Sequence, residues 1–124
     1  MIVRTFLKSL SHALRGLSHA SLRERNFQIE LFAAALVIPA LLFLPLELWE
    51  VVTVLFLVGW VLVLELINTA IERIVDILMP RVHPNAKLVK DLMAASVLII
   101  SFVSVIIAVL ILLPAATEFF HAIE

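Results

Sequence analysis

Residues Leu92–Leu113 form a run of 22 residues without a charged side chain. A helix needs about 20 predominantly apolar residues to cross the hydrocarbon core of a bilayer. Leu31–Leu46 and Val51–Leu64 are also uncharged. Of the 124 residues, 64% are hydrophobic and 15% charged, against about 45–50% and about 25% in soluble domains, and a chain this short cannot bury the excess. The sequence therefore predicts a small integral membrane protein rather than a soluble enzyme.

The predicted fold is an all-α integral membrane protein with three transmembrane helices, preceded by an N-terminal amphipathic surface helix. No glycine or proline occurs between Leu64 and Pro80, so the second span is expected to continue without a break into a cytoplasmic extension. Within this single membrane domain we expect a surface helix at 1–25, spans at 28–46, 48–79 and 88–113, and an extracytoplasmic tail at 114–124.

The segment before the first span is amphipathic rather than uniformly apolar. Its apolar side chains recur at helical spacing, opposite a side that carries Arg4, Lys8 and Arg15. A cleaved signal sequence would instead have a continuous apolar stretch and a cleavage site of small residues, and the segment has neither. It is therefore expected to lie in the lipid interface. Its periodic apolar residues are Val3, Phe6, Leu7, Leu10, Ala13, Leu14 and Leu17.

The nine lysines and arginines all fall on one side of this predicted topology. Five precede the first span, and four lie at the end of the second span or in and beside the loop that follows it. The turn at 45–50 and the segment after 113 contain acidic residues but neither lysine nor arginine. By the positive-inside rule, the N-terminus is cytoplasmic and the C-terminus extracytoplasmic, in a multi-pass protein of the plasma (inner) membrane.

Four polar residues follow one face of the second predicted helix toward its cytoplasmic end, namely Glu65, Asn68, Glu72 and Asp76. Glu65 directly follows the uncharged run, so it lies about 10 Å deeper in the bilayer than Glu72. Arg73 is expected to point away from this face. An ionisable side chain inside a span is energetically costly and is by default a candidate functional residue.

The depths of these carboxylates suggest separate roles. Glu72 and Asp76, near the aqueous boundary, are suited to Mg²⁺, which commonly binds one or two carboxylates together with substrate phosphates. Glu65, removed from water, is suited to accept a proton from a lipid hydroxyl. Glu24 and Glu30 add two carboxylates at the start of the first span.

Phosphate groups would have to be neutralised by side chains. The only two glycines, Gly16 and Gly59, lie too far apart to form a glycine-rich phosphate loop, and the absence of cysteine excludes thiolate metal sites. Basic residues beside a carboxylate cluster are what a nucleotide–metal complex requires. The charged residues of the cytoplasmic loop are Arg81, His83, Lys87, Lys90 and Asp91.

The same residues also permit functions other than phosphoryl transfer. The polar stripe could join helices within an oligomer, although three acidic groups would repel one another. The chain could be a small proton-coupled transporter that uses Glu65 as its proton site, or an accessory subunit without enzymatic activity. The basic loop and the additional carboxylates favour phosphoryl transfer. On the third span, a side of small residues indicates close helix packing, formed by Ala94, Ser101, Ser104 and Ala108.

Three stretches of the sequence resemble the prokaryotic diacylglycerol kinase family. They are ELINTAIERIVD from Glu65 to Asp76, ERNF from Glu24 to Phe27, and HPNAKLVKDLMAA from His83 to Ala95. The resemblance covers about residues 4–113. It implies an ATP-dependent, Mg²⁺-requiring lipid kinase that assembles as a homotrimer, with Glu65 as the catalytic base. It also implies that Glu24 and Glu72 bind the metal that bridges the ATP phosphates.

The same resemblance also assigns the remaining site residues. A nucleic-acid partner is not expected. The lipid headgroup would lie near Asn26, Glu30, Glu65 and Asn68. The nucleotide site would comprise His12, Glu24, Glu72, Asp76, Arg81, His83, Lys90 and Asp91.

The resemblance implies that the acceptor lipid is either diacylglycerol or undecaprenol. Diacylglycerol-specific members carry an arginine and a tyrosine where this chain has Thr5 and His12, and Arg4 is adjacent. The ERNF stretch and the HPNAK loop resemble the branch that phosphorylates undecaprenol.

Overall fold

The computed structural model describes residues 2–79 and 83–123, and Arg81, assigned above to the nucleotide site, lies outside these ranges. The described residues form four helices and no strand. The helices are α1 (Ile2–Arg23), α2 (Arg25–Phe43), α3 (Leu48–Leu78) and α4 (Pro84–His121). Three of them, α2, α3 and α4, are long and apolar enough to cross a membrane. The predicted all-α membrane fold with three spans is confirmed.

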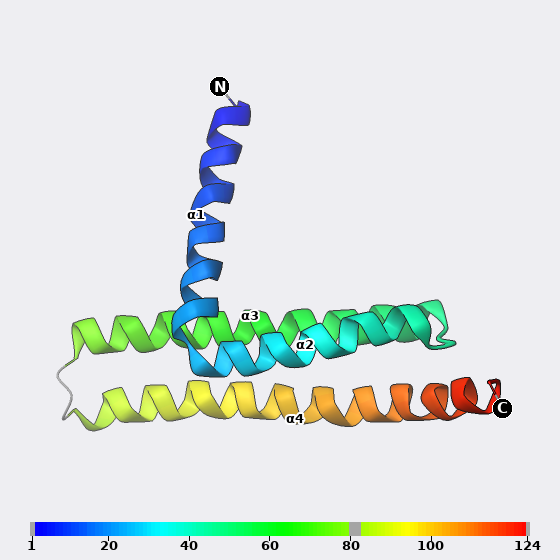
Figure 1. Ribbon diagram of the computed structural model, residues 1–124. Helices are drawn as coiled ribbons and strands as arrows, with labels where there is room; N and C mark the ends of the chain where they lie inside the picture. The colour runs from blue at the N-terminus through cyan, green and yellow to red at the C-terminus, as the bar shows by residue number, and fades with distance from the viewer. Residues whose placement is uncertain (1, 80–82, 124) are drawn as a thin grey trace.

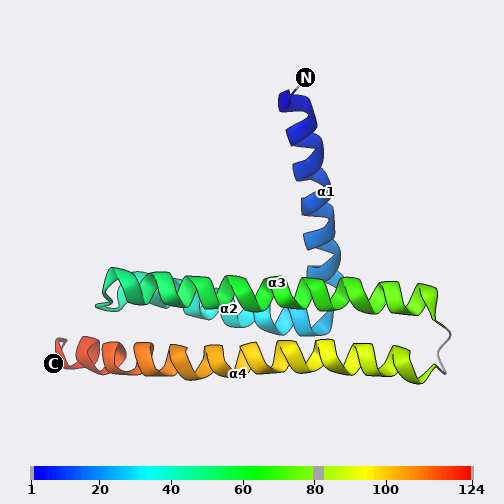
Figure 2. The same cartoon turned by 180° about the vertical axis from the view of Figure 1, so that it is seen from behind.

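The three long helices run side by side with alternating direction, and α1 projects away from them (Figure 1). α3 packs against both α4 and α2, while α1 contacts α2. The view from behind shows that α3 and α4 extend beyond the junction of α1 and α2 (Figure 2). The end of α3 that carries the predicted acidic stripe therefore lies at the same end of the bundle as the α1–α2 junction.

A single extended residue turns the chain between α1 and α2. Glu24 has φ −102° and ψ 112°, outside helical geometry, and its backbone N–H still donates to the carbonyl of Ala20. Ala20 and Phe27 are buried on either side of this turn, and the Gln28 side chain donates to the carbonyl of Ser21 at 3.1 Å. These contacts hold the start of α2 in place.

A proline and a capping box set the end of α2 and the start of α3. α2 stops at Phe43, three residues before the expected end at 46, because Leu44 precedes a proline and adopts an extended conformation. α3 matches its expected range of 48–79 closely. It begins with a capping box in which the Glu47 side chain and the Glu50 side chain each accept from the other's backbone N–H.

α4 is longer than expected. His83 caps its start by accepting from the Asn85 backbone N–H at 3.3 Å, and a proline follows at the first helical position. The helix then continues through Pro114 to His121, so that most of the segment expected as a tail is helical. Near this proline, the Thr117 hydroxyl donates to the Pro114 carbonyl at 2.7 Å.

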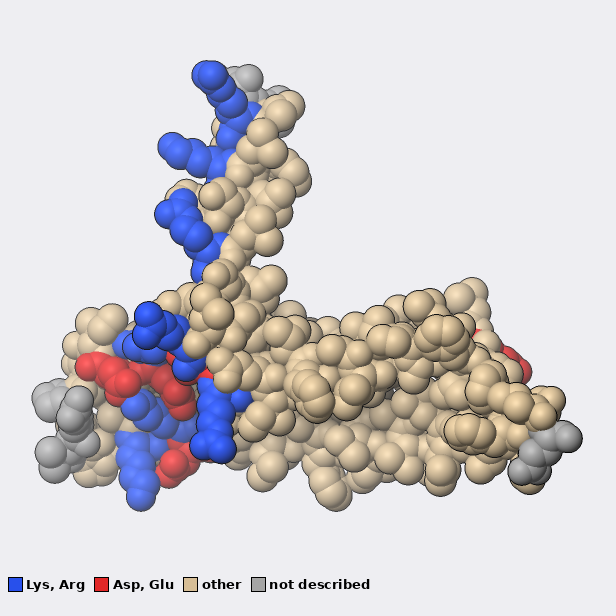
Figure 3. All heavy atoms as spheres, in the orientation of Figure 1, with Lys and Arg blue, Asp and Glu red and all other residues tan. Residues whose placement is uncertain are grey.

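Apolar side chains of all three long helices meet at the end of the bundle away from α1. Leu41, Val54 and Ile111, one from each long helix, form a buried cluster there. Most other large apolar side chains of the bundle are exposed, which suits helices whose outer faces contact lipid. In the view of Figure 3, charged side chains gather instead around the α1–α2 junction, and the middle of the bundle shows none.

The basic side chains of α1 lie along one side of that helix (Figure 3). Its leucines, including Leu7, Leu10 and Leu14, are exposed rather than packed against the bundle. Placement of α1 in the lipid interface stays a prediction, and these unpacked leucines are consistent with it.

Val54→Ala tests the packing of the bundle. Val54 is 1% exposed, whereas Val52 on the same helix is 56% exposed. We expect Val54→Ala to lower the free energy of unfolding by about 1–3 kcal/mol because it leaves a cavity between the helices. Val52→Ala, the control, should change it by less than about 0.5 kcal/mol. Equal effects in a reversible unfolding measurement in micelles would contradict this packing.

Candidate active site

Two buried polar side chains of α3 mark the site. Glu65 is 2% exposed and Asn68 is 5% exposed, and no other polar or charged residue of the described chain is buried to this degree. Glu65 Oε2 and Asn68 Oδ1 have no hydrogen-bond partner among the described residues. A buried polar atom without a partner costs about 1–3 kcal/mol, so its persistence calls for an explanation in function.

α2 brings further carboxylates to this point. Phe27 and Ala34 are buried on its packed face, and Glu24 and Glu30 lie along the same part of the helix. Glu30 is close enough to Glu65 for electrostatic repulsion, and its Oε2 is buried without a partner among the described residues. The start of α2 therefore brings two carboxylates near those of α3.

Glu65 is the centre of this group. It interacts electrostatically with Glu72 on its own helix and with Glu24 at the start of α2. The side chains of Asn26 and Asn68 lie within hydrogen-bonding reach of its carboxylate. We call Glu24, Glu30, Glu65 and Glu72 the acidic cluster.

Two ion pairs join helices of the described chain at the end of the bundle that carries the α1–α2 junction. Arg73 Nη2 lies 2.9 Å from Glu24 Oε1, and Lys90 Nζ lies 2.5 Å from Asp76 Oδ1. The second pair places Lys90 of α4 beside Asp76 of the acidic stripe. The first differs from the prediction that Arg73 points away from the site. Arg73 and Glu24 are 49 residues apart in the sequence, so the spacing of residues along one helix could not predict that they pair.

Three further predicted nucleotide residues that the structure describes are His12, His83 and Asp91. His12 Nδ1 is 3.1 Å from Arg15 Nη2 within α1, and His83 caps α4. Asp91 is exposed on α4. In the described chain no hydrogen bond or ion pair joins these three residues to the acidic cluster, so their assignment to the nucleotide site rests on the resemblance alone.

Comparison with known proteins identifies the family. The profile described as prokaryotic diacylglycerol kinase matches residues 11–112. The chain is 40% identical to undecaprenol kinase of Bacillus subtilis (strain 168), over 88% of this chain and 89% of that one. The chain belongs to the prokaryotic diacylglycerol kinase family.

Two further relatives carry the name diacylglycerol kinase. The protein of Synechocystis is 36% identical over 91% of this chain, which spans 65% of that longer relative. The protein of Haemophilus influenzae is 34% identical, over 75% of this chain and 79% of the relative. Relatives of both names support the same class of enzyme, and the chain is a lipid kinase that acts in a membrane.

An apolar groove connects the acidic cluster of this lipid kinase to the membrane-spanning part of the bundle. It lies between α2, α3 and α4, has a volume of about 230 Å³, and includes Glu30 among its lining residues. Its walls carry small side chains from α2 and α4. Ser104 Oγ, which lines it, is buried without a hydrogen-bond partner in the described chain. Small residues of the third span, expected to allow close helix packing, here leave space: Ser101, Ser104 and Ala108.

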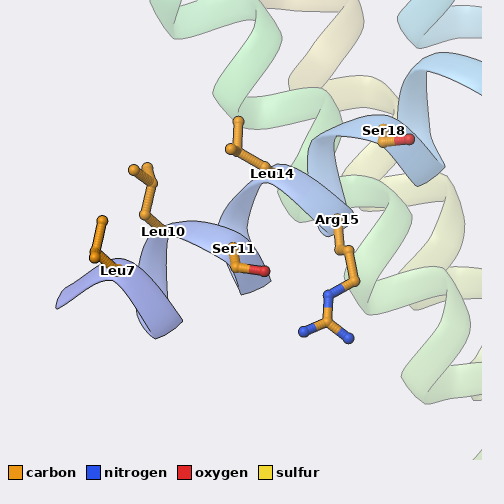
Figure 4. A pocket seen from close by; sticks show the side chains of 6 residues that line it. All are labelled: Leu7, Leu10, Ser11, Leu14, Arg15 and Ser18. Carbon is orange, nitrogen blue, oxygen red and sulfur yellow. The ribbon is translucent and has the colours of Figure 1, made fainter. Parts of the chain in front are cut away.

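A second hollow lies on α1 alone. Leu7, Leu10 and Leu14 project to one side of the helix and Arg15 to the other (Figure 4). This hollow is open and contains no carboxylate, so it offers no group that could accept a proton. The groove beside the acidic cluster is the candidate site for the reaction.

The acidic cluster suits a hard divalent cation when other ligands come from the substrate. No group of three or more His, Cys, Asp or Glu side chains forms a preassembled metal site within residues 2–79 and 83–123. Mg²⁺ commonly needs only one or two carboxylates, with phosphates and water completing its shell. Glu24 already holds a cationic group, the Arg73 guanidinium, and half-buried Glu72 has no cationic partner in the described chain. The donor set fits Mg²⁺ bound together with phosphates.

Glu65→Gln should stabilise the fold. The substitution removes a buried charge that is repelled by neighbouring carboxylates, and the new amide can donate to the unpartnered Asn68 Oδ1. We expect the free energy of unfolding to rise by about 1–2 kcal/mol, measured by reversible unfolding in micelles. Glu118→Gln, an exposed control at the far end of α4, should leave it unchanged. A loss of stability in Glu65→Gln would argue against a strained carboxylate at this position.

Proposed function

We propose that this lipid kinase transfers the γ-phosphoryl group of ATP to the hydroxyl of a membrane lipid alcohol at the cytoplasmic face. The observation that carries the proposal is the buried Glu65 carboxylate, with one oxygen unpartnered in the described chain, among the carboxylates that border the apolar groove. A carboxylate in this position can take a proton from an alcohol that arrives through the hydrocarbon layer.

In the proposed reaction, Glu65 accepts the hydroxyl proton as the alcohol oxygen attacks the γ-phosphorus. The bond from the γ-phosphorus to the bridging oxygen breaks, and ADP leaves with that oxygen and its electron pair. Asn26 and Asn68, within reach of the same carboxylate, orient it and the hydroxyl. Phosphoryl transfer depends mainly on such positioning and on charge stabilisation, since the protein forms no covalent intermediate.

Glu24 and Glu72 are the residues proposed to hold Mg²⁺, which would supply positive charge to the phosphates. Lys90 contributes a further cation, and its charge is balanced by Asp76. The remaining members of the proposed nucleotide site are His12, Arg81, His83 and Asp91. Glu30 lies at the groove, where the headgroup of the acceptor is expected.

The proposed acceptor is undecaprenol or diacylglycerol. Both present a primary alcohol at the membrane surface on one or two hydrocarbon chains, and the groove offers apolar walls for such a chain. The relative with 40% identity is named undecaprenol kinase, and those with 36% and 34% identity are named diacylglycerol kinase. We favour the polyprenol.

We also propose the membrane topology and the assembly. The positions of the nine basic residues support a cytoplasmic N-terminus and an extracytoplasmic C-terminus in the plasma (inner) membrane. Charged side chains remain exposed around the acidic cluster of a single chain, among them Arg73 and Asp76. Enclosing them away from lipid requires neighbouring copies, which supports the homotrimer that the family resemblance implies.

Glu65→Gln should abolish transfer while MgATP binding is retained. Loss of a general base typically lowers the rate by about 10²–10⁴-fold, and Glu65 is not a proposed phosphate or metal ligand. The measurement is transfer of radiolabelled phosphate to a short-chain lipid alcohol in micelles, with nucleotide binding measured separately. Near-normal turnover would remove Glu65 from the mechanism. Wild-type protein without any transfer activity would instead favour the proton-coupled transporter.

Glu24→Gln and Glu72→Gln should each raise the Mg²⁺ concentration needed for half-maximal activity. Because the two carboxylates are proposed to share one cation from different helices, the double variant should lose less than the sum of the two single effects. Glu118→Gln serves as the charge-matched control. Additive losses with an unchanged Mg²⁺ dependence would mean that the two residues bind nothing in common.

Undecaprenol, or another polyprenol, should be phosphorylated at least as well as diacylglycerol. An apolar pocket distinguishes hydrocarbon chains weakly, by about 1–3 kcal/mol per methylene at most, so that some activity on both lipids is expected. The measurement is kcat/KM for each lipid at equal mole fraction in the same detergent. A preference for diacylglycerol above about tenfold would contradict the acceptor prediction and leave the kinase assignment intact.

A further inference from the structure

The Arg73–Glu24 ion pair connects two functional parts of the molecule. Arg73 lies one residue after Glu72 on α3, and Glu24 is the turn residue that begins α2. The guanidinium reaches the carboxylate at 2.9 Å with side-chain exposures of 63% for Arg73 and 22% for Glu24. The pair therefore lies at the rim of the acidic cluster and includes one of the two carboxylates proposed to hold the metal.

Glu24 needs a cation at this position. Its side chain makes no helix-capping hydrogen bond, it is mostly buried, and it interacts unfavourably with the nearby Glu65 carboxylate. A guanidinium is always protonated and matches a carboxylate geometrically, so it compensates this charge without needing a metal. Arg73 supplies that compensation.

A divalent cation and this guanidinium compete for the same carboxylate. Mg²⁺ binds oxygen at about 2.0–2.1 Å and demands near-ideal octahedral geometry. A positive group held at Oε1 opposes its binding through charge repulsion and takes one of the two carboxylate oxygens. Metal binding to Glu24 is therefore weaker while Arg73 is paired with it, and the exposed Arg73 side chain has room to move away.

We propose that Arg73 is a positioning residue that occupies Glu24 as a place-holding cation when no metal is bound and weakens the binding of a divalent cation on its own. This inference rests on the proposed role of Glu24 as a metal ligand. When a nucleotide arrives with the metal, its phosphates offer the released guanidinium a new anionic partner. The competition is then relieved, so that the enzyme favours the metal–nucleotide complex over the free metal.

The test uses Mn²⁺ alone as the probe, because carboxylate sites for Mg²⁺ also accept Mn²⁺, which is detected by electron paramagnetic resonance. The full-length protein is titrated in micelles without nucleotide. Exposed ion pairs are typically worth up to about 1 kcal/mol, so Arg73→Gln should tighten Mn²⁺ binding about two- to five-fold. Arg73→Lys, which keeps the charge, should remain closer to the wild type. With a non-hydrolysable ATP analogue present, the advantage of Arg73→Gln should disappear.

Arg25→Gln is the matched control. Arg25 directly follows Glu24 and carries the same charge as Arg73, but it forms no ion pair in the described chain. Equal tightening in Arg25→Gln and Arg73→Gln would reduce the effect to general electrostatics and overturn the inference. Because Arg73 is exposed, its variants are expected to fold, which circular dichroism checks.

Glu24→Gln separates failure of this inference from failure of the proposed function. If Glu24→Gln loses Mn²⁺ binding but Arg73→Gln leaves it unchanged, the inference is wrong and the metal role of Glu24 stands. If Glu24→Gln binds Mn²⁺ as tightly as the wild type does, both the inference about Arg73 and the proposed metal role of Glu24 are wrong. When Glu24→Gln is already present, adding Arg73→Gln should no longer tighten Mn²⁺ binding, because the proposed competition requires the Glu24 carboxylate.

Discussion

A bilayer offers the backbone no water, and this constraint decides the form of the whole chain. Every amide within a span must find its partner in the same segment, so the three apolar stretches can cross only as helices. The chain even keeps α2 and α4 helical past Pro39 and Pro114, and it breaks α2 only at Leu44, before the turn. Each helix makes its own backbone hydrogen bonds. The contacts between helices can therefore include buried polar and charged side chains that would disrupt a smaller soluble core.

The site exploits that freedom. Glu65 and Asn68 occupy buried positions on α3 where apolar residues would pack at lower free energy, and Glu30 and Glu24 meet them from α2. Repulsion within the acidic cluster is compensated at its rim by Arg73 rather than inside it. The result is a carboxylate oxygen without a partner in the described chain, beside an apolar groove. This arrangement suits the proposed deprotonation of an alcohol that stays within the membrane.

Prediction from the sequence was most reliable where the physical signal is local. The uncharged runs and the turn residues predicted three spans, and the predicted bounds of α3 nearly match those observed. Helical spacing predicted that Glu65, Asn68 and Glu72 share one face. Prediction was least reliable for α4, because the uncharged run ends at Leu113 whereas the chain stays helical to His121. The motif also predicted the family, which the comparisons confirm. His12, His83 and Asp91 stay predictions, since the structure joins none of them to the acidic cluster within the residues it describes.

Hydropathy, charge and helical periodicity are enough to predict that this protein crosses a membrane three times, that its basic residues lie toward one side, and that a polar stripe lines its second span. All three signals act between residues a few positions apart, so they can be recognised along the chain. The approach of Glu24 and Glu30 to Glu65, the pairing of Arg73 with Glu24 across 49 residues, and the groove bordered by small residues of α4 emerge only in the folded bundle. Those contacts depend on how each helix is rotated against its neighbours, and rotation is settled by side-chain packing between helices rather than by any local pattern.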